Sequence, residues 1–203
     1  MKRLQIIYLV PVFIVSSVLC SNAFGYKVDK TWLGKVIKWN TNNVTYYVNT
    51  SGDPSNSLSA IQSSAQTWTD VSTSSFSFSY GGATTSTAVY KNDKRNIICF
   101  GSMGEGVLAR NGVWSSKITG KITDSDIKIN TYYSWATDGS ADKYDIQSVV
   151  THELGHSLRL LDLYEDSDVN PTRKTMYYKT PAGNTEQRTL EQDDMDGITY
   201  LYP

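Results

Sequence analysis

The chain has 203 residues and a formal net charge of −1. This length suits a single domain with a proper hydrophobic core. The near-neutral charge gives no electrostatic footprint for nucleic acid or for an anionic membrane, so we expect neither as a partner.

The first residues have the pattern of a secretory signal peptide. Two basic residues precede an apolar run over residues 4–19, and small residues stand at the positions expected before a cut at Tyr26. The run is short for a bilayer span and Pro11 interrupts it, which argues against an uncleaved anchor. We therefore expect residues 1–25 to be removed and residues 26–203 to form one exported domain, secreted to the periplasm or medium of a bacterium.

Periodicity predicts the elements of that domain in chain order. Alternation of apolar and polar residues predicts strands at residues 36–48 and 76–80, and a continuous apolar run predicts a strand at 96–100. Residues 120–130 supply another strand, and residues 107–110 a further extended segment. Three- and four-residue spacing predicts helices at residues 58–71, from Asp145 through Leu158, and after Thr189. Asp145 is the expected N-cap of the second helix, and Thr189 with Gln192 has the spacing of a capping box for the third.

Cys99 lies in the predicted strand at 96–100, where we expect it to be buried. It would be the only cysteine left after signal cleavage, so no intramolecular disulfide is expected.

The run His152-Glu153-Leu154-Gly155-His156 contains the only two histidines of the chain. Two imidazoles four residues apart on a helix lie one turn apart on the same face, where both can reach a single metal ion. A glutamate directly after the first histidine is where a zinc peptidase keeps its general base. The alternative is a coincidental motif on a solvated helix face, which requires both histidines to fall in this frame by chance. The pattern predicts a zinc site.

The surrounding sequence resembles the matrixin branch of the metzincins. The run from His152 to Asp162 is similar to the signature H-E-x-x-H-x-x-G-x-x-H/D, and Thr175-Met176-Tyr177 resembles the Met-turn beneath the metal. Further similar segments lie at residues 68–71, 106–109, 144–150 and 190–202. The resemblance implies an α/β (α+β) fold with a twisted, mostly parallel five-stranded sheet and three helices. It also implies a secreted zinc metalloendopeptidase that acts on extended polypeptides.

The resemblance implies a role for each residue of the site. His152, His156 and Asp162 would bind one catalytic zinc ion, Glu153 would be the general base, and Met176 would belong to the Met-turn. A carboxylate is an acceptable third ligand for zinc.

Arg159 departs from the family pattern, which usually has glycine there to let the chain leave the helix. A residue with a β-carbon loses about 1–2 kcal/mol in the left-handed conformation, a cost that metal binding can offset. The alternative is that the helix continues through Leu161 and turns Asp162 away from the histidines. Solvent or a later carboxylate would then complete the site, namely Glu165, Asp166 or Asp168.

The resemblance also suggests residues of a substrate cleft. Val107, Leu108 and Ala109 resemble the edge strand that pairs with an extended substrate, and an ordinary edge strand is an equal alternative. Tyr178 lies two residues after Met176, where some metzincins place a tyrosine near the metal, although a rim or surface role is favoured here.

Related proteins bind a structural zinc ion and calcium ions in addition to the catalytic zinc. Arg110 and Lys128 stand where two histidines of a structural zinc would fall, so a second zinc of that kind is excluded. Calcium is a further candidate, through acidic clusters such as Asp124 with Asp126. None of these clusters has the spacing of a defined calcium loop.

Two other functions remain open from the sequence. A displaced Asp162 would leave a zinc-binding interaction module with weakened catalysis. A peptidase with a distant glutamate as third ligand, such as Glu186 or Glu191, explains neither Met176 nor the closing helix. We expect a monomer.

Overall fold

The computed structural model describes residues 25–164 and 173–203. The predicted signal segment therefore lies outside the described residues, apart from Gly25, and so do Glu165, Asp166 and Asp168. Within the described ranges, no helix is long and apolar enough to cross a membrane.

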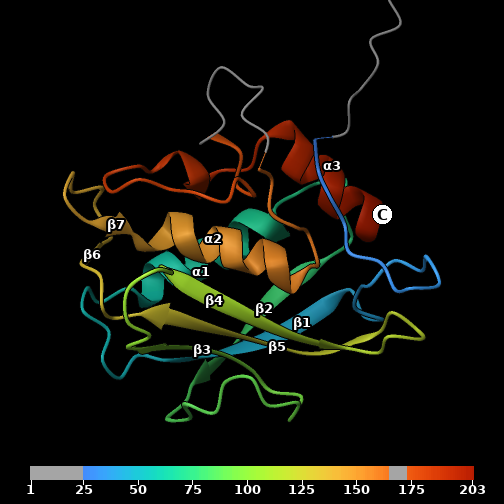
Figure 1. Cartoon of the computed structure of the whole chain (residues 1–203), viewed down its shortest axis with the longest axis horizontal. Helices are drawn as coiled ribbons and strands as arrows, with labels where there is room; N and C mark the ends of the chain where they lie inside the picture. The colour runs from blue at the N-terminus through green and yellow to red at the C-terminus, as the bar shows by residue number, and fades with distance from the viewer. Residues whose placement is uncertain (1–24, 165–172) are drawn as a thin grey trace, which may run out of the picture.

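A five-stranded sheet forms one layer of the domain (Figure 1). Its strands are β1 (Asn43–Asn49), β2 (Ser77–Ala83), β3 (Asn96–Gly101), β4 (Ala109–Ser115) and β5 (Ile122–Asn130). Their order across the sheet is β2-β1-β3-β5-β4, and only β4 runs antiparallel to its neighbour. β4 is therefore an edge strand with one side unpaired in the sheet.

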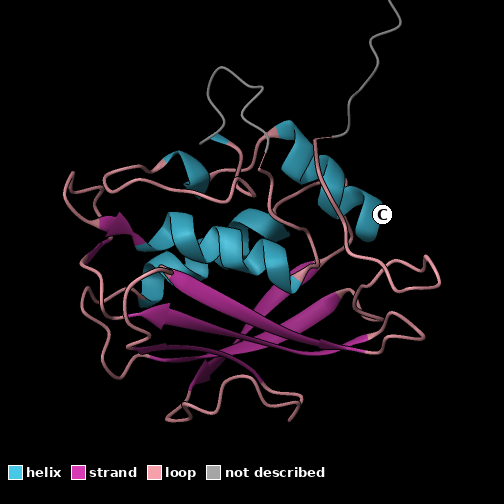
Figure 2. Cartoon of the chain, viewed as in Figure 1, coloured by secondary structure: helices cyan, strands magenta, loops and turns pink. Residues whose placement is uncertain are grey.

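Three helices accompany the sheet, as Figure 2 shows: α1 (Leu58–Thr69), α2 (Ile146–Ser157) and α3 (Gln192–Leu201). α1 and α2 pack side by side on one face of the sheet, and α3 lies beyond α2. The core fills the space between α1, α2 and the sheet, where Trp68, Ile127, Val150 and Leu154 are fully buried. The predicted α/β fold with a mostly parallel five-stranded sheet and three helices is confirmed.

The predicted first strand was too long. Residues 36 and 38 form only isolated bridges, and β1 begins at Asn43. The interruption is a turn in which the Thr41 hydroxyl donates to the Asn43 carbonyl and accepts from the Asn43 N–H. Short polar side chains of this kind compete with the strand ladder for backbone groups.

The predicted capping box of the third helix was also wrong by two residues. Glu191, not Thr189, is the N-cap of α3, and its partner in the capping box is Asp194. Thr189 instead ends a short 3₁₀ helix, η2 (Glu186–Arg188), which the sequence pattern did not predict. Two other expectations are confirmed: Asp145 caps α2, and Cys99 is buried on β3.

Candidate metal centre and cleft

α2 presents the two histidines at the boundary between core and solvent. Its apolar stripe of Ile146, Val150 and Leu154 is buried against the sheet. His152 and His156 lie beside this stripe, with 15% and 22% of their side-chain surfaces exposed. Their rings meet edge to face with centroids 4.6 Å apart, as the four-residue spacing on a helix requires.

α2 ends at Ser157, and the chain turns sharply at Arg159. Arg159 has a φ of 72°, in the left-handed region, and the Leu160 N–H returns to the Gly155 carbonyl at 3.1 Å. This is a helix C-terminus of the kind that usually has glycine at the left-handed position. The alternative of a helix that continues through Leu161 is therefore wrong.

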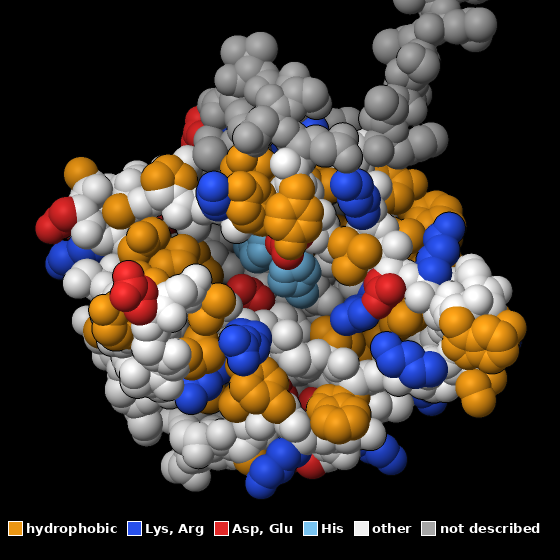
Figure 3. All heavy atoms as spheres, viewed as in Figure 1, with side chains coloured by type: hydrophobic (Ala, Val, Ile, Leu, Met, Phe, Trp, Pro, Cys, Tyr) orange, Lys and Arg blue, Asp and Glu red, His pale blue; other side chains and the backbone are white. Residues whose placement is uncertain are grey.

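The turn brings Asp162 to the histidines. Its Oδ1 lies 3.2 Å from His152 Nε2 and 3.4 Å from His156 Nε2. Among the described residues, these three are the only group of at least three histidine, cysteine or acidic side chains whose ligand atoms lie close enough to hold one metal ion, within 4.8 Å of one another. Figure 3 shows the histidine side chains at the floor of a hollow with acidic side chains beside them.

Each imidazole is hydrogen-bonded through Nδ1 to a backbone carbonyl oxygen. His152 Nδ1 lies 2.7 Å from the Thr175 carbonyl oxygen, and His156 Nδ1 lies 2.9 Å from that of Leu160. A carbonyl oxygen only accepts, so each Nδ1 carries the proton and donates it. The neutral imidazole then has its lone pair on Nε2, facing the other donors, and this is the arrangement that metal-binding histidines use.

The charges of the cluster shift its pKa values. Burial raises the pKa of Asp162, but the two imidazoles outweigh it and hold that pKa well below its usual range. Burial lowers the pKa of His156, whereas Asp162 and Glu153 raise it, to about 8 overall, so metal binding at its Nε2 has to release a proton. The Asp162 carboxylate is therefore ionised at neutral pH, as a metal ligand must be.

Glu153 lies between the two histidines in sequence and is 6% exposed. Burial raises the pKa of its carboxyl, although the two imidazoles oppose the shift. Its backbone carbonyl accepts a 2.7 Å hydrogen bond from the Asn111 side chain, which reaches across from β4. Asn111 also donates to Ser157 Oγ at 2.7 Å, so α2 is tied to the sheet at this residue. No motif in the sequence indicated that Asn111 would contact α2.

Met176 packs against Gly155 of α2 and is 2% exposed. A β-carbon at Gly155 would lie 2.3 Å from Met176 Sδ, so the glycine inside the histidine motif permits this close approach. Asp194 holds the same loop from α3, because its carboxylate accepts from the N–H groups of Thr175 (2.9 Å) and Met176 (3.3 Å). The loop that carries Thr175 and Met176 is thus fixed to both α2 and α3.

The cluster opens into a cleft of 490 Å³. The predicted cleft residues Val107, Leu108, Ala109 and Tyr178 all line it, together with His152, Glu153, His156 and Asp162. Only Ala109 belongs to β4, because Val107 and Leu108 precede the strand, so the expected extended segment begins two residues late. Their carbonyls are used by Asn130, whose side chain donates to Val107 and whose N–H donates to Leu108.

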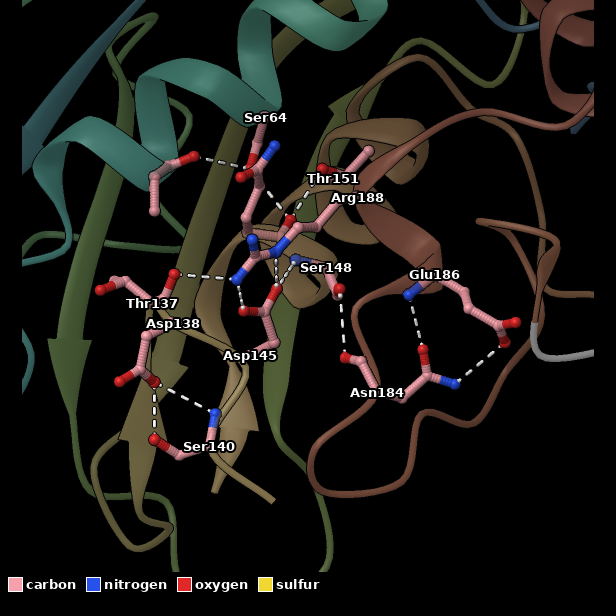
Figure 4. A network of polar contacts seen from close by, with 12 residues as sticks. Ser64, Thr137, Asp138, Ser140, Asp145, Ser148, Thr151, Asn184, Glu186 and Arg188 are labelled. Atoms are coloured by element: carbon pink, nitrogen blue, oxygen red, sulfur yellow. Dashed lines mark hydrogen bonds and ion pairs between the residues drawn. The ribbon is translucent and has the colours of Figure 1, made fainter. Parts of the chain in front are cut away.

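An ion pair ties the start of α2 to η2 (Figure 4). Arg188 of η2 donates to both carboxylate oxygens of Asp145, from Nε at 3.0 Å and from a terminal guanidinium nitrogen at 2.5 Å. Asp145 also caps α2, because its side chain accepts a hydrogen bond from the Ser148 N–H. Next to Arg188, Gln187 lines the cleft and donates to the carbonyls of Lys174 and Tyr177. The sequence carried no pattern from which this link between distant segments could be predicted.

Tyr164 is a further residue that sequence reasoning missed. Its hydroxyl donates to Asp162 Oδ2 at 3.1 Å, on the carboxylate oxygen that points away from the histidines. Its ring packs on Tyr178 with centroids 4.8 Å apart. The H/D position of the motif identifies the carboxylate, but no sequence signal identified its hydrogen-bond partner.

The other candidates of the sequence analysis lie elsewhere. Asp124 and Asp126 are fully buried in β5 and accept backbone N–H groups of Arg95, Tyr90 and Ile97. Calcium binding at these residues stays a prediction. Glu191 caps α3 and Glu186 lies in η2, and neither belongs to the metal-ligand group.

Comparison with known proteins agrees with this geometry. The sequence model of the matrixin family matches residues 38–203. A curated relative, metalloendoproteinase 1 of Glycine max, is 36% identical over 86 residues, which cover 39% of this chain and only 26% of the relative. Among solved structures, a chain of the GM1 bound form of the ECX AB5 holotoxin is similar with a TM-score of 0.51 and 11% identity, over 88% of each chain. The last likeness concerns the fold alone.

Proposed function

Because the chain belongs to the matrixin family, we propose that it is a secreted, zinc-dependent endopeptidase that cleaves extended polypeptides. The observation that carries this proposal is the group of His152, His156 and Asp162, which converges in a cleft with Glu153 beside it. The family match supports a metallopeptidase in general.

The three donors fit zinc by their chemistry. Two neutral imidazoles and one carboxylate are a usual catalytic set that leaves a fourth position open. Both Nε2 lone pairs are directed by the carbonyl bonds at Nδ1. A zinc ion held by these residues would act as a Lewis acid on the scissile carbonyl and would make water a nucleophile at neutral pH.

Glu153 has the properties of a general base. Its carboxylate lines the cleft next to the metal ligands, and burial raises its pKa toward the working range of a proton carrier. It would accept a proton from the attacking water and deliver that proton to the amine that leaves. Asn111 would position it by holding its backbone carbonyl.

The edge of β4 would bind the substrate backbone. β4 has no partner strand on its outer side, and Ala109 at its start lines the cleft. An extended peptide added there would form main-chain hydrogen bonds like those of a sixth strand. Val107 and Leu108 would contact its side chains, and Tyr178 would form the rim on the other side, next to the Met-turn.

The signal pattern at residues 1–25 supports export. We propose that the exported domain is a monomer, and zinc is the one metal that we assign to it. The competing proposal is a zinc-binding interaction module without efficient catalysis. It is favoured by the strain at Arg159, which has a φ of 72°.

The test is digestion of unfolded casein by residues 26–203, with zinc content measured on the same samples. We expect cleavage that chelation abolishes and zinc restores. Glu153→Gln should keep one zinc ion per chain and lose cleavage, whereas Asp162→Ala should lose both. Glu186→Gln, outside the cluster, is the matched control and should change neither. Equal cleavage by wild type and Glu153→Gln would rule out the peptidase. Stoichiometric zinc without cleavage would favour the interaction module.

A further inference from the structure

We propose that one end of the molecule docks on the surface of an anionic phospholipid membrane. The docking end consists of two neighbouring loop tips. Their outermost side chains are three apolar ones, Trp32, Leu33 and Ile118, and four basic ones, Lys30, Lys35, Lys117 and Lys121. This surface lies outside the cleft, and the proposal is independent of the peptidase activity.

Backbone hydrogen bonds join the two loops side by side. The Lys38 N–H donates to the Gly120 carbonyl and the Ile122 N–H donates to the Lys38 carbonyl, both at 3.0 Å. Gly120 lies so close to the first loop that a β-carbon there would be 2.5 Å from the Val36 carbonyl oxygen. Both loops project from the same end of the domain, at the right of Figure 1. The two tips therefore form one surface.

Each tip is a tight turn rather than a loose loop. In the first tip, the Thr31 N–H donates to the Lys35 carbonyl at 2.8 Å and the Gly34 N–H donates to the Thr31 carbonyl at 2.9 Å. In the second, the N–H of Gly120 donates to the Ser116 carbonyl at 2.9 Å. The turns hold the side chains at their tips outward.

The apolar side chains at these tips are unusually exposed. Trp32, Ile118 and Leu33 leave 78%, 63% and 50% of their surfaces accessible. Single exposed apolar residues are ordinary, but three on adjacent rigid tips make a surface that water solvates poorly. Tryptophan in particular favours the boundary between headgroups and hydrocarbon, because its ring is apolar and its N–H is polar.

The charge of this end is opposite to that of an anionic surface. Residues 30–38 and 115–123 contain five lysines and no acidic residue, in a chain whose net charge is −1. Lys38 is engaged by the Leu201 carbonyl and the Tyr202 ring. The other four lysine side chains are exposed. None of them belongs to an ion pair in the described parts of the chain. Figure 3 shows basic side chains among the hydrophobic ones toward this edge.

An anionic bilayer fits this arrangement better than a protein partner. Apolar side chains at the points of two projections can enter the headgroup layer, while flanking ammonium groups meet the lipid phosphates. A stable protein interface buries on the order of 800 Å² on each partner, whereas contact with a bilayer requires only the apolar tips and the charges beside them. The near-neutral net charge of the chain predicted no membrane partner. That prediction is wrong under this proposal, because the net charge sums basic and acidic residues that the fold places on different parts of the surface.

The test is co-sedimentation of residues 26–203 with vesicles of phosphatidylglycerol and phosphatidylcholine in equal parts, and with phosphatidylcholine alone. We expect binding to the anionic vesicles that weakens with added salt, and little binding to the neutral ones. The Glu153→Gln variant is used throughout, so that proteolysis does not affect the assay. Its binding would persist even if the proposed catalytic activity were absent.

Variants separate the docking end from general charge. Lys30→Glu/Lys35→Glu should weaken binding by about 25-fold or more, since each lysine near the surface contributes about fivefold. The control Lys91→Glu/Lys143→Glu makes the same charge change at exposed lysines outside both tips and should bind nearly as wild type. Trp32→Ala/Leu33→Ala should weaken binding, whereas Tyr132→Ala, which removes another exposed aromatic ring, should not.

Brominated lipids provide a second readout, because they quench tryptophan that enters the bilayer. The quenching should fall in Trp32→Phe even if binding is retained. The proposal is overturned by absence of binding to anionic vesicles, by equal loss in the lysine control, or by quenching that does not depend on Trp32. Dimers in sedimentation that Trp32→Ala/Leu33→Ala dissociates, without vesicle binding, would identify a protein interface instead.

Discussion

Asp29 pairs with Arg159 through its carboxylate, and its backbone N–H donates to the Arg159 carbonyl at 3.1 Å. The neighbouring Leu161 N–H donates to the Lys27 carbonyl at 2.8 Å. The segment before the sheet thus forms a short antiparallel contact with the segment that carries Asp162. The bend that brings Asp162 to the histidines is stabilised by a distant part of the chain, where the family usually relies on glycine.

This relationship predicts an order of stability for substitutions at Arg159. Arg159→Ala keeps a β-carbon in the left-handed region and loses the ion pair, so it should lower the free energy of unfolding by about 2 kcal/mol. Arg159→Gly loses the same ion pair but relieves about 1–2 kcal/mol of backbone strain. Glycine should therefore be more stable than alanine by about 1 kcal/mol in urea denaturation.

Asp29→Asn provides the complementary measurement. It removes the charge that Arg159 faces but leaves the backbone contact, so it should destabilise the protein and speed zinc loss to a chelator. Equal stability of the alanine and glycine variants would show that Arg159 does not occupy the left-handed conformation in solution.

The contact between Gly155 and Met176 predicts strong coupling between two substitutions. Gly155→Ala gains about 1 kcal/mol of helix propensity, but its methyl group would overlap Met176 Sδ, which would lie at 2.3 Å. Because Met176 is 2% exposed, the overlap should produce a net destabilisation of about 1–3 kcal/mol. Met176→Ala should create the missing space. A double-mutant cycle measured by thermal unfolding should therefore show that the double variant is more stable than the sum of the single effects. Additive effects would contradict the packing.

How far the sequence predicted the site depended on the range of each interaction. His152, His156, Asp162 and Met176 were predicted because their spacing resembles a known signature. The structure brings the first three together and packs Met176 against Gly155, between the two histidines in sequence. Asp29 and Arg188 could not be identified, because each acts on a residue far away in the chain. No local periodicity encodes such a pair.

The prediction of secondary structure from the sequence was limited in the same way. A continuous apolar run predicted β3, whose successive residues are buried, and four-residue spacing predicted α2, including its cap at Asp145. The start of β1 was placed too early, because Val36 and Lys38 alternate like a strand but pair elsewhere, as isolated bridges to Lys30 and Lys121. Alternation records which face of a segment is buried, whereas hydrogen-bond partners are decided by the tertiary structure.

Asp194 gives a prediction for the dependence of stability on pH. Burial, reinforced by the Asp193 carboxylate, raises the pKa of Asp194 to about 7, although backbone N–H groups of Thr175, Glu191 and Met176 oppose the shift. The folded state then binds a proton more tightly than the unfolded state, where the pKa is near 3.8. The contribution of Asp194 to stability should therefore fall as pH rises from about 4 to about 7, and should be constant above that.

The measurement is the difference in unfolding free energy between wild type and Asp194→Asn across this range. The contributions of the histidines and of the other acidic residues to the pH dependence cancel in this difference, because both proteins contain these residues. Asp194→Asn should be less stable at every pH, since an amide replaces an acceptor of three backbone N–H groups, and the gap should narrow toward neutral pH. A gap that widens with pH would mean that the N–H groups outweigh burial and that the carboxylate is ionised throughout.

The hydroxyl of Tyr164 predicts a change in metal retention without a change in fold. Tyr164→Phe removes the 3.1 Å hydrogen bond to Asp162 Oδ2 but keeps the ring that packs on Tyr178. Loss of such a partner of a ligating carboxylate typically costs about 10–100-fold in metal affinity. We expect zinc transfer to a chromophoric chelator to accelerate by about tenfold, at the lower end of that range.

Tyr178→Phe, which removes a neighbouring hydroxyl, is the matched control and should release zinc at the wild-type rate. Unfolding temperatures of the three apoproteins should agree, since the bond is at the surface. If Tyr164→Phe and Tyr178→Phe released zinc equally fast, the hydroxyl of Tyr164 would have no role in orienting Asp162.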